Sequence, residues 1–168
     1  MPSILNPLGK IIEATEKKYT LFFLLSYEKS ERKIKIEISK RPVKGHFETK
    51  NYLGIPILLI KKEAMVAGKL AAFLTRKKFA ARDLFDLWFF LKNDWEIDEE
   101  FFENKTGFSL KQGLKKAINK LKMIKPNQLL QGLGELLEEK QKNWVKDKLK
   151  NELAFCLKLY LSKTLSTF

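Results

Sequence analysis

The sequence predicts an α+β protein, with a small N-terminal mixed β-sheet that carries helices and a C-terminal helical bundle. Two observations lead to this class. Short runs rich in β-branched and aromatic residues, typical of strands, fall within the first 60 of the 168 residues. After Lys61, apolar residues recur at three- and four-residue steps, the spacing of helices that bury one face. We therefore expect a sheet region at residues 1–60, a helix pair at 61–93 and a helical region at 94–168.

The start of the chain is expected to hold one helix and two strands. Asn6–Lys18 is predicted as a short amphipathic helix, with Pro7 in a first turn that tolerates proline. Tyr19–Tyr27 is nearly continuous in apolar residues, the pattern of a strand that is covered on both faces. Arg32–Ser39 alternates strictly between polar and apolar residues after a polar turn. The two strands are therefore expected to pair as an antiparallel hairpin.

The following stretch leads into a pair of helices. Lys40–Gly54 is polar and contains proline and glycine, so we expect it to run over the surface. Ile55–Ile60 is short and wholly apolar, which predicts a buried strand. Lys61–Leu91 has the spacing of two buried helix faces, and the break at Arg76–Phe79 predicts a hinge between the two helices.

The rest of the chain is predicted to be helical. A short helix is expected after Asp98, which can cap it. Three further helices are expected, at Ser109–Met123, at Pro126–Glu139 and from Asn143 to about Leu161. Two glycines weaken the middle one by about 1 kcal/mol each relative to alanine, so its packing must compensate.

The scarcity of cysteine and histidine excludes several classes of site. Cys156 is the single cysteine, so the chain has no intramolecular disulfide and no cysteine cluster for zinc. His46 is the single histidine, which argues against histidine metal sites and Ser-His-Asp catalysis. The sequence also has no apolar run long enough to span a bilayer and no signal peptide. A cytoplasmic protein with no membrane partner is therefore expected.

The charge of the chain is strongly positive. With 33 Lys and Arg against 20 Asp and Glu, the formal net charge is +13. Such an excess favours polyanionic partners through long-range attraction and counterion release. Lysine-rich coding in a low-GC genome explains the same excess equally well, so composition leaves both explanations open.

Five charged residues stand out as candidates for a site, although each also has a structural explanation. Glu37 lies on the polar face of a predicted strand, where a cross-strand ion pair on a solvated sheet surface is the simpler explanation. Lys69 lies among small residues that leave room for a phosphate, or it extends its ammonium group to the surface. Asp83 and Asp86 lie in the first turns of a helix, which favour negative charge, and Arg82 is spaced to pair with Asp86.

The order of these residues resembles a known family. The motifs are Lys35-Ile36-Glu37-Ile38, then Ala67-Gly68-Lys69-Leu70-Ala71-Ala72, then Arg82-Asp83-Leu84-Phe85-Asp86-Leu87. In this order they resemble the central portion of the AbiEii/AbiGii toxin family of nucleotidyltransferases, in the polymerase-β-like superfamily. The resemblance covers most of the chain and implies a partial nucleotidyltransferase-like fold.

The resemblance also implies a reaction and roles for the five residues. The implied reaction transfers a nucleoside monophosphate from an NTP to an acceptor hydroxyl, with RNA as one candidate acceptor and Mg²⁺ as cofactor. Glu37 would then be the sheet carboxylate that positions metal or activates the acceptor. Lys69 would contact the phosphates of the nucleotide, and Asp83 would be the helical acidic residue of the active site. Arg82 and Asp86 would orient Asp83 or bind the nucleotide.

One motif of that family is missing from this sequence. The Gly-rich turn followed by a strand with two paired aspartates occurs nowhere in the 168 residues. Two catalytic metal ions need several carboxylates, and the sheet region offers only Glu37 in a matching motif. We therefore expect the chain alone to be catalytically deficient, as a truncated or split enzyme whose metal-binding strands are absent or supplied by another chain.

Two other functions compete with this hypothesis. The chain is alternatively a noncatalytic basic module, in which an open sheet edge recruits partners and the positive charge serves RNA or an acidic antitoxin-like protein. In the third hypothesis the chain is a helical protein whose charges serve only its structure.

Overall fold

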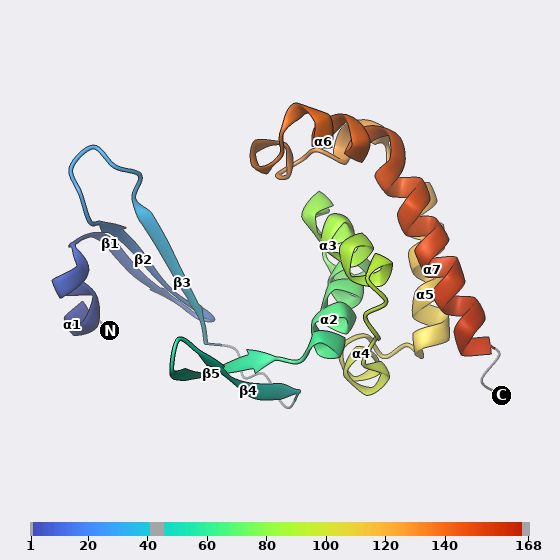
Figure 1. Ribbon diagram of the computed structural model, residues 1–168, viewed down its shortest axis with the longest axis horizontal. Coiled ribbons are helices and arrows are strands. Elements are labelled where there is room, and N and C mark those ends of the chain that lie inside the picture. The colour runs from blue at the N-terminus through green and yellow to red at the C-terminus, as the bar shows by residue number, and fades with distance from the viewer. Residues whose placement is uncertain (1, 41–45, 166–168) are drawn as a thin grey trace. The chain divides into compact units, whose positions relative to one another are not determined.

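The computed structural model describes residues 2–40 and 46–165, which form two compact units, Met1–Gly45 and His46–Phe168 (Figure 1). The predicted α+β class is confirmed, since the strands precede the long helices along the chain. All the strand pairs described are antiparallel. None of the helices in the described ranges has the length and apolar character needed to cross a membrane.

The N-terminal unit is a three-stranded sheet preceded by a short helical segment. Helix α1 (Pro2–Leu5) continues into a 3₁₀ turn at Asn6–Leu8. The strands β1 (Lys10–Lys17), β2 (Thr20–Ser26) and β3 (Ile34–Ser39) follow in spatial order β1-β2-β3. The predicted hairpin of β2 and β3 is thereby confirmed.

The helix predicted at Asn6–Lys18 is wrong, because most of this segment is the strand β1. Its pairing with β2 runs from Lys10 opposite Ser26 to Lys17 opposite Thr20 and joins the backbones of the two strands by hydrogen bonds. The register shifts between Ile11 and Glu13, as in a β-bulge. This shift breaks the two-residue alternation of apolar side chains, which is why the sequence does not look like a strand.

The small core of this unit lies on one face of β2. Phe23 and Leu25 are buried together with Leu5, and Ile36 of β3 packs against them. The alternate residues of β2, such as Phe22, are only half-buried. The two faces of this strand are therefore covered unequally.

The helical unit begins with a hairpin that the sequence reading missed. The polar segment Lys40–Gly54 was predicted as a surface excursion, but β4 (Phe47–Tyr52) lies within it and pairs with β5 (Ile55–Ile60). The part of that prediction at 41–45 lies outside the described residues. The two-residue turn Leu53–Gly54 has φ values of 50° and 82°, as in a type I′ hairpin.

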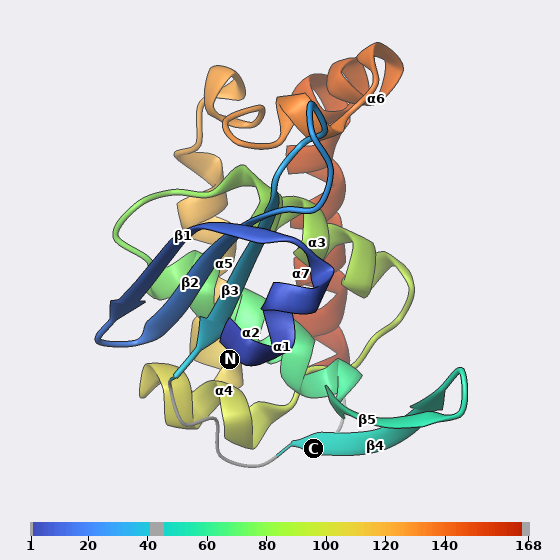
Figure 2. The same cartoon turned by 90° about the vertical axis from the view of Figure 1, so that its left-hand side faces the viewer.

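Strand β5 confirms the predicted strand but not its predicted burial. Leu58 is 66% exposed and Ile55 is 63% exposed. The reason is that β5 pairs only with β4 in a two-stranded ribbon, which extends away from the helices (Figure 2). Ile60, at its end, packs against the helical core.

The helices of the second unit largely follow the predicted ones. Helices α2 (Lys62–Thr75) and α3 (Ala81–Lys92) confirm the expected pair. The side chain of Asp98 accepts a hydrogen bond from the Phe101 N–H and so caps α4 (Glu99–Thr106). Helix α5 (Leu110–Lys122) starts with a capping box.

The helix predicted at Pro126–Glu139 is wrong. Two 3₁₀ turns, Pro126–Gln128 and Gly134–Leu136, lie in this segment. Gly132 between them has a φ of 69°, a left-handed conformation that interrupts a helix. Regular structure resumes with α6 (Glu139–Trp144), earlier than expected.

The last helix is continuous but not uniform. Helix α6 passes through a π-helical segment, Val145–Leu149, into α7 (Lys150–Leu165). Helices α5 and α7 lie side by side (Figures 1 and 2), α2 contacts α3, α4 and α5, and α7 also contacts α3. Fully buried side chains from these helices form the main core, among them Leu70, Leu84, Phe102, Leu114 and Leu153.

Candidate functional site

A cluster of ion pairs joins α2 to the start of α3. The Nζ of Lys69 lies 2.5 Å from Asp86 Oδ2 and 3.3 Å from Asp83 Oδ1. The other carboxylate oxygen of Asp83 lies 3.0 Å from Nη1 of Arg76. Asp83 is thus paired with two cations, and Lys69 is shared between two carboxylates.

Asp83 is the centre of this cluster. It is 2% exposed and is the buried charged residue among those that the structure describes. Its position in the first turn of α3 places the carboxylate where the helix dipole favours negative charge. A buried carboxylate is tolerated only when its charge is compensated, so the contacts with Lys69 and Arg76 are required for this fold.

The end of α2 is held by two basic residues. Arg76 is its C-cap and has extended backbone angles, so the chain leaves the helix there. The Nζ of Lys120, on α5, donates to the carbonyl oxygens of Phe73 at 2.7 Å and Leu74 at 3.1 Å. A cation at the last carbonyls complements the negative end of the helix dipole. The start of the connection between α2 and α3 is therefore held by Arg76, which pairs with Asp83 of α3, and by Lys120 of α5.

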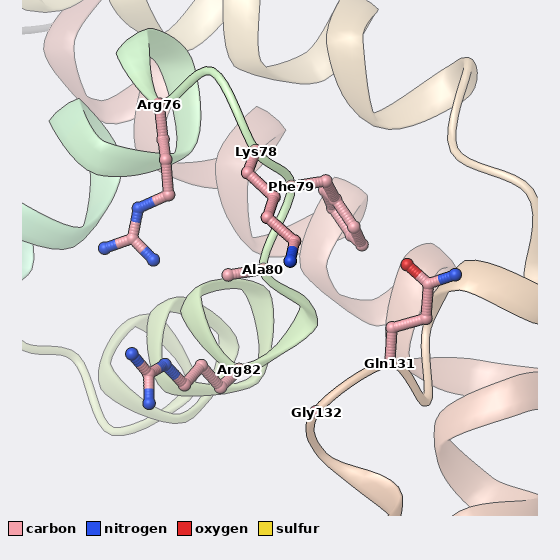
Figure 3. Close-up of a pocket in the computed structure, with 7 residues that line it drawn as sticks. All are labelled: Arg76, Lys78, Phe79, Ala80, Arg82, Gln131 and Gly132. Carbon is pink, nitrogen blue, oxygen red and sulfur yellow. The ribbon is translucent and has the colours of Figure 1, made fainter.

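An open pocket with a volume of about 610 Å³ adjoins this connection. We call it the cationic pocket. Figure 3 shows that its side chains come from the connection, from the first turn of α3 and from a separate loop. The residues that line it are Arg76, Lys78, Phe79, Ala80, Arg82, Gln131 and Gly132.

The charge of the cationic pocket is not balanced locally. Within residues 2–40 and 46–165, neither Lys78 nor Arg82 has an ion-pair partner within 4.0 Å. Arg76 is paired with Asp83 through one of its nitrogen atoms and lines the pocket as well. Arginine presents several N–H donors in a fixed plane that matches phosphate oxygens. The pocket has the chemistry of an anion site.

The structure brings together three of the five predicted site residues. Lys69, Asp83 and Asp86 are in direct contact, and Arg82 lies on the same helix and lines the pocket. The predicted ion pair between Arg82 and Asp86 is not found, because Asp86 binds Lys69 instead. The functional roles assigned to these residues stay predictions.

Glu37 belongs to the N-terminal unit. It lies on β3, opposite Phe22 of β2, and its carboxylate is 3.0 Å from the Nζ of Lys35 on the same strand. This ion pair joins two residues of the same strand. The simpler explanation for Glu37 predicted from the sequence was instead an ion pair between neighbouring strands. The proposed role of Glu37 at a metal stays a prediction.

The donors of the helical cluster do not fit a divalent cation. Both carboxylate oxygens of Asp83 are occupied by cationic side chains, and Asp86 contacts Lys69. Mg²⁺ requires carboxylate oxygens that are free to bind it. Across the described part of the chain, no group of three or more Asp, Glu, His or Cys side chains is arranged to hold a metal ion.

Several residues of the cationic pocket were not assigned to a site from the sequence. Arg76 and Lys78 lie in the segment predicted as a hinge, in a basic run that directly precedes the Arg-Asp motif. Gln131 and Gly132 lie in a segment predicted as a helix, so nothing indicated that they face α3. The basic run was a usable signal, whereas the loop gave none.

Comparison with solved structures shows the fold. JHP933 from Helicobacter pylori matches with a TM-score of 0.55 and 22% identity, over 95% of this chain and 66% of that one. A second structure, described as a nucleotidyltransferase from H. pylori, matches with a TM-score of 0.54 and 20% identity, over 94% and 69%. The chain thus spans about two thirds of the length of these proteins.

Comparison of sequences shows the family. A search of curated protein sequences gives no significant match. A family model described as "Nucleotidyl transferase AbiEii toxin, Type IV TA system" matches residues 6–155. Because this match takes in both the three-stranded sheet and the ion-pair cluster around Asp83, the chain belongs to the AbiEii family of nucleotidyl transferase toxins.

Proposed function

We propose that the cationic pocket binds the phosphates of an NTP, in a protein built for nucleoside monophosphate transfer to an acceptor hydroxyl. The observation that carries this proposal is the set of three cations, Arg76, Lys78 and Arg82, around one open pocket. Phosphoryl transfer depends chiefly on positioning and on neutralising phosphate charge, and these side chains supply both. Membership of the AbiEii family supports the same reaction class.

In this proposal Asp83 is a positioning residue. Its buried carboxylate holds the guanidinium of Arg76 at 3.0 Å, so this cation keeps a fixed place at the wall of the pocket. Lys69 fixes Asp83 in turn through the contact at 3.3 Å. The earlier hypothesis that Lys69 itself touches a phosphate requires that its ammonium group leave Asp86.

We further propose that the 168-residue chain does not catalyse transfer by itself. Each carboxylate of the helical cluster is already paired with a cationic side chain, and the paired aspartates of the family motif do not occur in the sequence. Glu37 provides one carboxylate at most. The metal-binding strands would then lie outside these 168 residues, and the family description, a toxin of a type IV TA system, supports an antitoxin as a counterpart.

Equilibrium binding of the four radiolabelled NTPs to the purified chain tests the pocket. We expect Lys78→Ala and Arg82→Ala each to weaken binding about 10-fold, since a charged hydrogen bond contributes about 1.5 kcal/mol. Lys77→Ala is the matched control, because it removes the same charge from the neighbouring residue, which does not line the cationic pocket. Equal effects of all three variants, or no NTP binding at all, would contradict the proposal.

A transfer assay tests the second part. The chain is incubated with labelled NTP, Mg²⁺ and total RNA, and no label is expected in the RNA. Robust incorporation of label that depends on Mg²⁺ and disappears in Glu37→Ala would show that the chain is an active enzyme. It would contradict the proposal that the chain alone does not catalyse transfer. RNA binding with a steep salt dependence that is insensitive to Lys78→Ala and Arg82→Ala would instead favour the noncatalytic module.

A further inference from the structure

Three aromatic side chains form a second pocket in the helical unit. The rings of Trp88 and Trp144 have centroids 4.3 Å apart, and Phe85 lies 5.5 Å from Trp88 and 6.3 Å from Trp144. The three rings are tilted or edge-on to one another, so they leave faces that are not stacked on each other. All three side chains are half-buried and therefore still partly open to solvent.

Glu152 fixes the orientation of both indoles. Its two carboxylate oxygens accept hydrogen bonds from Trp88 Nε1 at 2.9 Å and from Trp144 Nε1 at 3.3 Å. Because both N–H groups are satisfied on this side, the indole rings are held in place with their polar atoms directed at Glu152. The Nζ of Lys92 lies 4.7 Å from the centroid of the Trp88 ring, and the other ring surface that lines the pocket is apolar and suited to a planar ligand.

The π-helical segment makes this arrangement possible. Trp144 and Glu152 are eight residues apart, which is about 2.2 turns of an α-helix and would leave them rotated by about 80° around its axis. The wider turn at Val145–Leu149 takes up an additional residue and brings the two side chains to one side. Such π-helical turns occur often at functional sites.

The second pocket has polar groups at its rim. It has a volume of about 310 Å³ and is lined by Phe85, Trp88, Lys140, Gln141 and Trp144. The Oε1 of Gln141 accepts from the Glu138 N–H, so its amide group remains as a donor. Within the described residues Lys140 has no ion pair, unlike its neighbour Lys142, which binds Glu139. We call this site the aromatic pocket.

The aromatic pocket follows the cationic pocket along α3. Phe85 is three residues after Arg82, and residues with this spacing are neighbours on a helix surface. The cationic pocket, at about 610 Å³, has the size of a complete small-ligand site. We therefore expect the cationic pocket to have room for the whole NTP, including its base. The separate aromatic pocket beside it then suits a second nucleotide.

We propose that the aromatic pocket holds an unpaired base of a single-stranded nucleic acid, whose adjoining phosphate lies against Lys140. Bases stack on aromatic side chains in most single-strand binding proteins, and basic residues follow the backbone. The amide of Gln141 is placed to donate to the edge of the base. This proposal rests on the proposed function for the reaction, in which the strand would be the acceptor, but its binding test is independent.

Fluorescence anisotropy with fluorescein-labelled octamers of riboadenylate and deoxyadenylate tests the proposal on the full chain. Trp144→Leu keeps an apolar side chain but removes the stacking surface, and we expect octamer binding to weaken about 10-fold or more. Trp144→Phe restores a ring and is expected to restore most of the affinity. Phe155→Leu is the matched control, because Phe155 is an exposed aromatic residue, 66% exposed, outside the pocket.

The outcomes separate this proposal from the proposed function. Loss of octamer binding with unchanged NTP binding in Trp144→Leu supports it, and a stronger loss for the riboadenylate octamer identifies RNA. Unchanged octamer binding overturns it. An equal loss of NTP binding also overturns it, since the base of the NTP would then occupy the aromatic pocket. Weak NTP binding by every variant would instead contradict the proposed function of the cationic pocket and leave this proposal unaffected.

A second variant keeps the test valid if Trp144→Leu fails to fold. Lys140→Gln leaves the rings in place and removes one phosphate contact. The plot of log affinity against log salt has a negative slope. We expect the magnitude of this slope to decrease by about 0.7, the contribution of one phosphate contact on a single strand. Lys158→Gln, an exposed lysine of α7 outside the pocket, is the control. Equal slopes for both variants contradict the proposal.

Discussion

Arg76 and Asp83 form an ion pair of 3.0 Å that joins the residue ending α2 to the first turn of α3. Asp83 is buried, while Arg76 reaches from it to the wall of the cationic pocket. The buried carboxylate therefore stabilises the hinge between the two helices and at the same time orients a cation toward the pocket. Stability and binding depend on the same contact.

Asp83→Ala is expected to destabilise the protein by about 1–3 kcal/mol, because it removes the carboxylate that contacts Lys69 and Arg76, whose own side chains stay partly exposed. The free energy of unfolding in urea measures this. Glu48→Ala is the control, since the ion pair of Glu48 with Lys50 on β4 is at the surface and contributes about 0–1 kcal/mol. Similar losses in both variants would mean that Asp83 is not a buried structural hub.

Two helical glycines are expected to respond in opposite ways to alanine. A Cβ at Gly113 of α5 would lie 2.2 Å from the Phe102 ring, which is fully buried and has no room to move. Gly113→Ala should therefore destabilise by about 1–3 kcal/mol. At Gly68 of α2 the nearest atom is 3.7 Å away, an ordinary contact, so Gly68→Ala should stabilise by about 0.5–1 kcal/mol.

Urea unfolding of both glycine variants checks the expected signs. The two positions are comparable because each lies inside a helix and faces a phenylalanine of α4. Stabilisation by Gly113→Ala would mean that the ring of Phe102 is not fixed by the core.

Tyr160 should make the stability sensitive to alkaline pH. Its hydroxyl donates to Glu96 at 2.7 Å and accepts from the Ile97 N–H at 2.9 Å. Burial, followed by the hydrogen bond to Glu96, raises the pKa of Tyr160 above its ordinary value of 10.0. Because the folded pKa is raised, this contribution to stability is complete below about pH 10 and is lost as the pH rises beyond it.

The melting temperature of Tyr160→Phe should be lower than that of the wild type at neutral pH, because two hydrogen bonds are lost. Its further decrease between about pH 9.5 and pH 11 should be smaller than that of the wild type. Tyr52→Phe, at an exposed tyrosine of β4, serves as the control. A decrease in Tyr160→Phe as steep as in the wild type would assign the alkaline sensitivity to other groups.

The helical half of the fold was predictable because its signals are local. The three- and four-residue spacing predicted α2 and α3, and the side chain of Asp98 caps α4 as expected. Strand β1 was missed because the register shift at Ile11 hides its alternation. Strand β4 was missed because the turn Leu53–Gly54 lacks the asparagine or aspartate that usually signals such a hairpin.

The candidate site was only half predictable. Lys69, Asp83 and Asp86 come together because sequence spacing sets which helix face each occupies. Spacing did not reveal that Asp86 pairs with Lys69 rather than with Arg82, because this choice depends on how α2 packs against α3. Gln131 reaches the cationic pocket from an irregular segment, whose path follows no sequence period.

The helical unit is expected to fold and bind without the N-terminal unit. The buried residues of its core lie between Ala64 and Leu157, and the cationic pocket is lined only by residues 76–132. The fragment His46–Phe168 should therefore unfold cooperatively and keep its NTP affinity. Met1–Gly45 should not fold alone, because the buried core of its described residues 2–40 consists of Leu5, Phe23 and Leu25 and a short three-stranded sheet buries too little apolar surface.

Urea unfolding followed by circular dichroism, together with NTP titrations of the same fragment, checks both parts of this expectation. The fragment with Arg82→Ala is the control for specific binding, since Arg82 lines the pocket without an ion pair in the described structure. A fragment that folds but no longer binds NTP would mean that the N-terminal unit contributes directly to the site. A fragment without a cooperative transition would mean that the helical core, despite its own buried residues, requires the sheet.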